Sequence, residues 1–82
     1  MISGTTRLYV IVGDPIGKVR SPETFNAGFA RHAIDAVMVP IETSPNDFVR
    51  AVVGLKCIRN LDGIVFTFPY KAEAMTLVDE VS

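Results

Sequence analysis

The residues best suited to chemistry in this chain lie in the segment 67–71, which has the sequence Thr-Phe-Pro-Tyr-Lys. Lys71 follows Pro69 by two residues, where an apolar run gives way to sequence compatible with a helix. Turns from strand to helix are where open α/β sheets build ligand sites. A helix N-terminus disfavours positive charge and is expected to lower the pKa of Lys71, which would let its amine donate or accept a proton. This hypothesis needs the amine desolvated at the mouth of a ligand pocket; the alternative is a surface lysine.

A second candidate segment follows the first apolar run and extends from Gly13 to Ser21. Its first part, up to Gly17, lacks the G-x-G-x-x-G spacing of a dinucleotide loop, and Pro15 has no backbone N–H to offer a phosphate. We therefore expect a turn that carries a small substrate loop. Ser21 is predicted to cap the helix that follows, a position that also attracts carboxylates. Thr67 is either a strand-forming residue or a ligand contact.

The composition argues against several classes of protein. The 82 residues include 8 basic and 9 acidic side chains, for a net charge of −1, whereas nucleic-acid binders carry a basic face. No apolar run approaches the roughly 18 residues of a membrane span. Cys57, the one cysteine, cannot form an internal disulfide, which fits a reducing cytoplasm. We expect it to be a buried, inert thiol and His32 to be a surface residue, and one of each is too few for a metal site.

Three short apolar runs must position these candidates. These runs cover residues 8–12, 36–41 and 63–68. They alternate with amphipathic stretches that begin near Ser21, Ser44 and Pro69. The first run is nearly continuous rather than alternating, as strands buried on both faces of a parallel sheet require. The chain is therefore predicted to be an α/β protein in β-α-β-α-β-α order. A mainly parallel sheet would lie between helices in three αβα layers.

Two of the amphipathic stretches begin with the same signal, a serine followed by a proline. The pairs Ser21-Pro22 and Ser44-Pro45 predict a serine cap with proline at the first helical position, and Asp47 stands at the capping-box position of the second. A three-stranded sheet would expose two edges. We therefore expect the chain to be a piece of a longer protein or to pair, for example as a homodimer.

Two segments resemble the motifs of the substrate-binding domain of shikimate dehydrogenases. The first motif of that family is approximately G-x-P-I-x-H-S-x-S-P-x-x-x-N, and residues 13–26 follow it without gaps as GDPIGKVRSPETFN. The second is approximately G-x-N-V-T-x-P-x-K, and residues 63–71 follow it as GIVFTFPYK. Residues 34–37 and Pro40 look like the family's second strand. The resemblance spans nearly the whole chain, in order.

The resemblance implies a two-domain enzyme in which residues 1–82 are the substrate-binding domain and a Rossmann domain outside this chain binds NADP. It implies the reversible oxidation of a ring hydroxyl of shikimate to the ketone of 3-dehydroshikimate, in aromatic amino acid biosynthesis. Carried over by position, Lys71 looks like the catalytic lysine and Thr67 like a contact to a substrate hydroxyl. Ser21 looks like the second of two serines at the substrate carboxylate. The 82 residues alone are expected to be inactive, because they hold no nucleotide site.

The chain departs from the family pattern at three positions. Val19 replaces the first serine, Val65 replaces the asparagine, and Lys18 stands where histidine is usual. A buried polar group left unpaired costs roughly 1–3 kcal/mol, so we expect a related or less polar hydroxy acid, with Val19 and Val65 as apolar walls. Lys18 or Arg20 could replace the lost carboxylate contact; otherwise both are solvated charges. The alternative function is a non-catalytic small-molecule binding module or a partner subunit.

Overall fold

The computed structural model describes residues 1–71 of the chain. They form three strands and two helices in the order β1 (Arg7–Gly13), α1 (Ser21–Arg31), β2 (Ala36–Glu42), α2 (Phe48–Leu55) and β3 (Leu61–Phe66). The predicted order is confirmed up to the third strand. The third helix, expected from about Pro69 onward, falls mainly outside the described residues.

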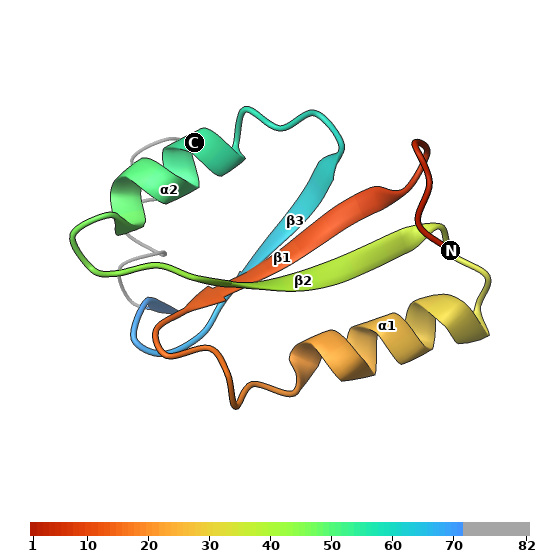
Figure 1. Cartoon of the computed structure of the whole chain (residues 1–82), viewed down its shortest axis with the longest axis horizontal. Coiled ribbons are helices and arrows are strands. Elements are labelled where there is room, and N and C mark those ends of the chain that lie inside the picture. Colours follow the sequence, from red (N-terminus) through yellow and green to blue (C-terminus); the bar gives the residue numbers. More distant parts are fainter. Residues whose placement is uncertain (72–82) are drawn as a thin grey trace.

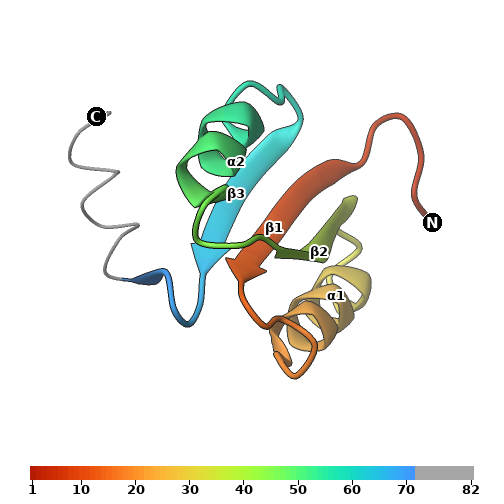
Figure 2. The same ribbon diagram turned by 60° about the vertical axis from the view of Figure 1, so that its left-hand side comes forward.

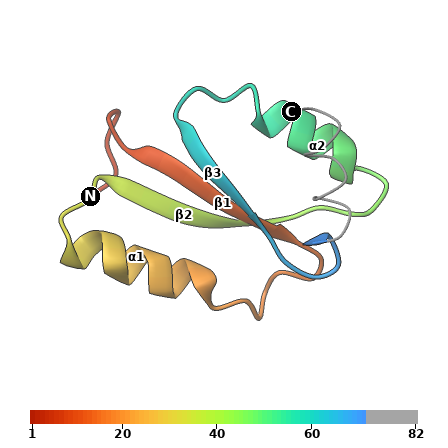
Figure 3. The ribbon, with the colours of Figure 1, turned by 180° about the vertical axis from the view of Figure 1, so that it is seen from behind.

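The three strands form one parallel sheet in the order β2-β1-β3. Helix α1 covers one face of this sheet and α2 covers the other, as the views from the front, the side and behind agree (Figure 1, Figure 2, Figure 3). Each helix therefore brings the chain back to the end of the sheet at which the next strand begins. The result is the predicted three-layer α/β arrangement, with all strand carboxyl ends at one edge.

The first apolar run forms the central strand, which explains why it does not alternate. Val10 and Val12 are almost fully buried on the α2 side, in a cluster with Phe48 and Val52. Successive side chains of a strand point to opposite faces, so Ile11 belongs to the α1 side and is 2% exposed. A strand covered on both faces needs apolar residues at every position.

Asn26 fastens α1 to the outer edge of the sheet. Its side-chain amide donates to the Met38 carbonyl at 3.0 Å, and its oxygen accepts from the Met38 N–H at 2.8 Å. These are main-chain groups of the edge strand β2, so the amide takes the place of a further strand at this position. An unpaired edge strand is thereby partly covered from within the molecule.

Neither helix begins with the serine cap that the sequence predicts. In α1 the residue before the helix is Arg20, which already has helical dihedral angles (φ −107°, ψ −5°), and no side chain caps the helix. A cap serine lies just before the helix with an extended backbone, whereas Ser21 is already the first helical residue. In α2, likewise, Ser44 donates to the Asp47 carboxylate at 3.2 Å instead of accepting from the main chain.

The third strand covers Leu61–Phe66 rather than the predicted 63–68. Thr67 N–H still donates to the Val12 carbonyl at 3.0 Å, but Tyr70 N–H donates to the Thr67 carbonyl at 2.9 Å. The second bond closes a turn over residues 67–70. Phe68 therefore lies in a turn and not in the strand, and its side chain is 74% exposed.

Cys57 is exposed, so the prediction of a buried thiol is wrong. It lies just after α2, where its N–H donates to the Gly54 carbonyl at 3.0 Å and holds the chain at the surface. His32 is exposed, as expected. Within residues 1–71 no helix has the length and apolar character needed to cross a membrane.

Candidate functional site

The candidate site lies where the three parallel strands end. The segments that follow them are residues 14–20 after β1, 43–47 after β2 and 67–70 after β3. The first and last of these meet beyond the sheet edge, with the turn after β3 in blue (Figure 1, Figure 3). Ligands of open α/β sheets bind outside the carboxyl ends of the strands, so this edge is the expected position for a site.

The two motif segments are in direct contact. Asp14 N–H donates to the Phe68 carbonyl at 3.2 Å. A side chain at Gly13 would have no space, because a Cβ placed there would lie 2.5 Å from the Thr67 methyl carbon and 3.0 Å from the Phe68 oxygen. Since Gly13 has no positive φ angle, the glycine is needed for this close approach and not for its backbone conformation. The approach holds the start of the first motif against Thr67 of the second.

The last residue of β2 and the segment that follows it join both of these loops. The Glu42 side chain accepts a hydrogen bond from Ile16 N–H at 3.0 Å, which fixes the loop after β1. Thr43 N–H donates to the Gly13 carbonyl at 3.3 Å, and the Thr43 carbonyl accepts from the Tyr70 hydroxyl. The three segments thus form one hydrogen-bonded unit at the sheet edge.

Two of the predicted site residues lie on the α1 side of the sheet. Val65 pairs with Ile11 in the ladder and so shares its face. Thr67 is two residues further on, and its methyl group approaches Gly13 from that same face. Ser21 is the first residue of α1, the helix that covers this face. Ser21, Val65 and Thr67, together with Val19, are all half-buried, as residues at a surface cleft would be.

Lys71 follows immediately after the turn and is exposed to solvent. The residues that the structure describes therefore do not supply the desolvation expected for its amine. Among those residues, no hydrogen bond or ion pair links the side chains of Lys71, Thr67 and Ser21. The structure brings the backbone segments of the two motifs together, while the grouping of these three side chains stays a prediction.

Sequence reasoning gave too little weight to Glu42 and Tyr70. Glu42 lies one residue beyond the second apolar run, and the sequence analysis predicts no role for it or for Tyr70. Tyr70 is completely buried and also donates to the Thr43 carbonyl. A tyrosine among apolar residues was the available signal, because a buried phenol normally has a hydrogen-bond partner. No sequence pattern could have named that partner, which lies 27 residues away.

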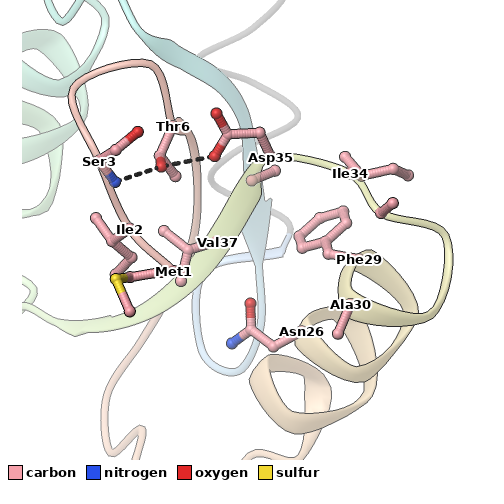
Figure 4. A pocket seen from close by; sticks show the side chains of 12 residues that line it. Met1, Ile2, Ser3, Thr6, Asn26, Phe29, Ala30, Ile34, Asp35 and Val37 are labelled. Carbon is pink, nitrogen blue, oxygen red and sulfur yellow. Dashed lines mark hydrogen bonds between the residues drawn. The ribbon is translucent and has the colours of Figure 1, made fainter.

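A groove of about 640 Å³ lies at the opposite edge of the sheet, beside the amino ends of β1 and β2 (Figure 4). Its polar groups already pair with one another or with the main chain. Both carboxylate oxygens of Asp35 accept hydrogen bonds, from Thr5 and Thr6, and these bonds lower the pKa of Asp35. The Asn26 amide is engaged by Met38. We therefore place the candidate site at the carboxyl edge and not in this groove.

Within residues 1–71, no three His, Cys, Asp or Glu side chains come together as a metal site would require. The side chains that the sequence analysis singles out near this edge are an amine, two hydroxyls and two isopropyl groups.

A parallel α/β sheet with its candidate site at the carboxyl edge defines a broad class of small-molecule binding domains. Comparison with known families narrows this class. Residues 11–82 match the family described as the shikimate dehydrogenase substrate binding domain, and the chain belongs to that family. The fold and the resemblance expected from the two motifs are both confirmed.

Relatives and solved structures agree with this assignment. The chain is 38% identical over 82 residues to the shikimate dehydrogenase (NADP(+)) of Pyrococcus furiosus, covering 100% of this chain and 30% of the relative. It is 40% identical over 77 residues to the corresponding protein of Anaeromyxobacter dehalogenans, covering 94% and 27%. The crystal structure of shikimate dehydrogenase from Aquifex aeolicus superposes with a TM-score of 0.87 at 32% identity, covering 94% and 29%. A shikimate dehydrogenase crystallised with NADP+ gives 0.86 at 27% identity, covering 94% and 26%. The chain thus spans less than a third of the length of these relatives.

Proposed function

We propose that this chain is the substrate-binding part of a longer NADP-dependent oxidoreductase that oxidises a ring hydroxyl of a cyclic hydroxy acid. Family membership supports the class. The observation that carries the proposal is the contact between the two motif segments, Asp14 to Phe68 and Gly13 to Thr67, at the carboxyl edge. Segments separated by about fifty residues in the sequence there form one surface. The proposal assigns Lys71, Thr67 and Ser21 of these segments to one ligand.

The described residues do not fit a dinucleotide. The loop after β1 lacks the glycine spacing of a pyrophosphate site, and Pro15 removes one of the N–H groups that such a site would use. We assign NADP, which accepts hydride in this class of reaction, to the additional length that the relatives possess. This chain would supply only the substrate site and the proton-transfer group.

Each proposed residue has a distinct role. The Lys71 amine takes the proton of the reacting hydroxyl as that carbon is oxidised, and it stabilises the charge that develops on oxygen. Thr67 donates or accepts a hydrogen bond with a ring hydroxyl. Ser21, at the start of α1, contacts the carboxylate, where the N–H groups of the first helical turn also attract negative charge. Desolvation of Lys71 would have to come from the bound acid or from segments outside the described residues.

The substrate is proposed to be less polar than shikimate around two of these contacts. Val19 and Val65 are half-buried isopropyl groups where the family pattern has hydrogen-bonding side chains. A ligand hydroxyl buried against either one loses a partner, at a cost of about 1–3 kcal/mol. Restoring the polar groups in Val65→Asn and Val19→Ser should therefore raise kcat/KM for shikimate by roughly tenfold each. An unchanged value for both variants would remove the argument for a less polar substrate.

The direct test is a spectrophotometric assay of the full-length protein with NADP and either shikimate or quinate. Lys71→Ala should lower kcat by about 10²–10⁴-fold, the usual contribution of a general acid or base. Lys56→Ala is the matched control, because Lys56 is also exposed but follows α2 at the opposite edge of the sheet. Full turnover by Lys71→Ala would show that the role given to Lys71 is wrong.

The exposure of Lys71 also supports a second candidate, a binding module without catalysis. Calorimetric titration of the full-length protein with cyclic hydroxy acids separates the two functions when it is combined with the assay. Binding without turnover in the presence of NADP would favour the module. Turnover that depends on Lys71 would exclude it.

A further inference from the structure

Tyr70, next to the proposed catalytic lysine, is held by both packing and hydrogen bonds. Its side chain is 0% exposed although Lys71 beside it faces solvent. The ring stacks on Phe48, the first residue of α2, with centroids 4.1 Å apart and planes 12° apart. Phe48 in turn meets Phe66, the last residue of β3, edge-on at 5.8 Å. The turn is thus anchored to the apolar core on its α2 side.

The Tyr70 hydroxyl adds a polar anchor that packing alone does not require. It donates to the Thr43 carbonyl in the segment after β2. Thr43 N–H donates in turn to the carbonyl of Gly13, the last residue of the central strand, at 3.3 Å. The main chain of Tyr70 is fixed as well, because its N–H closes the turn onto Thr67 at 2.9 Å. A hydrogen-bonded path therefore runs from the central strand to the residue that precedes Lys71.

This anchoring has a geometric consequence for the lysine. Consecutive Cα atoms are about 3.8 Å apart, so fixing Tyr70 in position and orientation also fixes where the Lys71 side chain starts. A long side chain amplifies small rotations of its own backbone. A misplacement of about 1 Å at a reacting group can cost on the order of 10²-fold in rate.

We propose that Tyr70 is a positioning residue for Lys71, acting through its buried hydroxyl and the Thr43 carbonyl. The proposal rests on the oxidoreductase function given above. It assigns Tyr70 no contact with the substrate, because its side chain is enclosed by the core and has no exposed surface. Its effect is on the rate of proton transfer and not on the affinity for the acid.

The test is Tyr70→Phe in the full-length enzyme, which removes one oxygen and keeps the stacked ring. We expect kcat to fall by about tenfold while KM changes less than twofold, a smaller loss than outright misplacement would give. Tyr9→Phe is the matched control. Tyr9 is the other tyrosine of the chain and packs on Phe29 on the α1 side, with ring centroids 5.4 Å apart. It should retain wild-type kcat.

A double variant separates positioning from a general loss of stability. If Tyr70 acts through Lys71, Tyr70→Phe should have no further effect on the residual rate of Lys71→Ala, because the group it positions is gone. A further tenfold loss in the double variant, or a kcat for Tyr70→Phe equal to wild type, would overturn the proposal. Wild-type enzyme inactive toward every acid tested would instead overturn the oxidoreductase function, and the role of Tyr70 with it.

Discussion

Replacing Gly13 with alanine should destabilise the protein although alanine suits a strand better than glycine does. The added methyl carbon would lie 2.5 Å from Thr67 Cγ2, 3.0 Å from the Phe68 oxygen and 3.1 Å from Ile16 Cδ1. Favourable carbon–carbon contacts lie at about 3.5–4.0 Å, so the Thr67 segment must move by roughly 1 Å. Overpacking of this kind costs about 1–3 kcal/mol, while the entropic gain from replacing glycine returns about 0.5–1 kcal/mol. We expect a net loss of about 1–2 kcal/mol in the free energy of unfolding.

Gly28→Ala provides the matched control for this prediction. Gly28 lies inside α1, and a Cβ placed there would have no neighbour within 4 Å, so alanine should stabilise the helix by about 0.5–1 kcal/mol. Both variants are compared with wild type by urea unfolding of the full-length protein, and KM for the acid reports displacement of Thr67. If Gly13→Ala proves as stable as Gly28→Ala, the two motif segments are not packed as described.

Two further predictions concern contacts away from the site. Asn26→Ala removes both hydrogen bonds to Met38 and should lower the free energy of unfolding by about 1–3 kcal/mol in urea; a loss below about 0.5 kcal/mol would mean that water replaces the amide without cost. The Arg7 guanidinium donates to Asp62 and lowers the pKa of that carboxyl below its ordinary value of 3.8. A carboxyl whose pKa is lower in the folded state stabilises the protein at pH values above its ordinary pKa. This stabilisation is lost as the pH falls through the pKa of the folded state. The Tm difference between wild type and Asp62→Asn should therefore be present at neutral pH and vanish in acid, and a constant difference across that range would contradict the assignment.

The order of elements could be predicted because it depends on patterns within single segments. The continuous apolar run around Val10 indicated a strand with two covered faces, and that strand is the central one. The edge strand β2 shows the opposite signature, with Val39 and Pro40 exposed and only Met38 buried. Periodicity carries this information because burial is imposed on whole faces of a strand.

Element boundaries were predicted less well, because they depend on contacts between segments. Ser21 and Ser44 have the residue type of a cap, but the residues that immediately precede the two helices are Arg20 and Asp47, both with helical backbone angles. Phe68 has the residue type of a strand, but the turn closed by Tyr70 overrides it. The exposure of Cys57 likewise follows from where α2 ends.

The sequence alone determined which residues could do chemistry and which family pattern they follow. Residue type and spacing suffice for that, since Lys71, Thr67 and Ser21 are identified by their neighbours along the chain. Only the tertiary structure decided that the loops after the three strands are joined at one edge, through Glu42, Thr43 and the buried Tyr70 hydroxyl. The predicted parallel sheet already implies that the carboxyl ends of the strands share one edge, but it does not say which side chains join the loops there. The side-chain hydrogen bonds of Glu42 and Tyr70 join residues that are 26 or 27 positions apart, so no pattern of neighbouring residues predicts them.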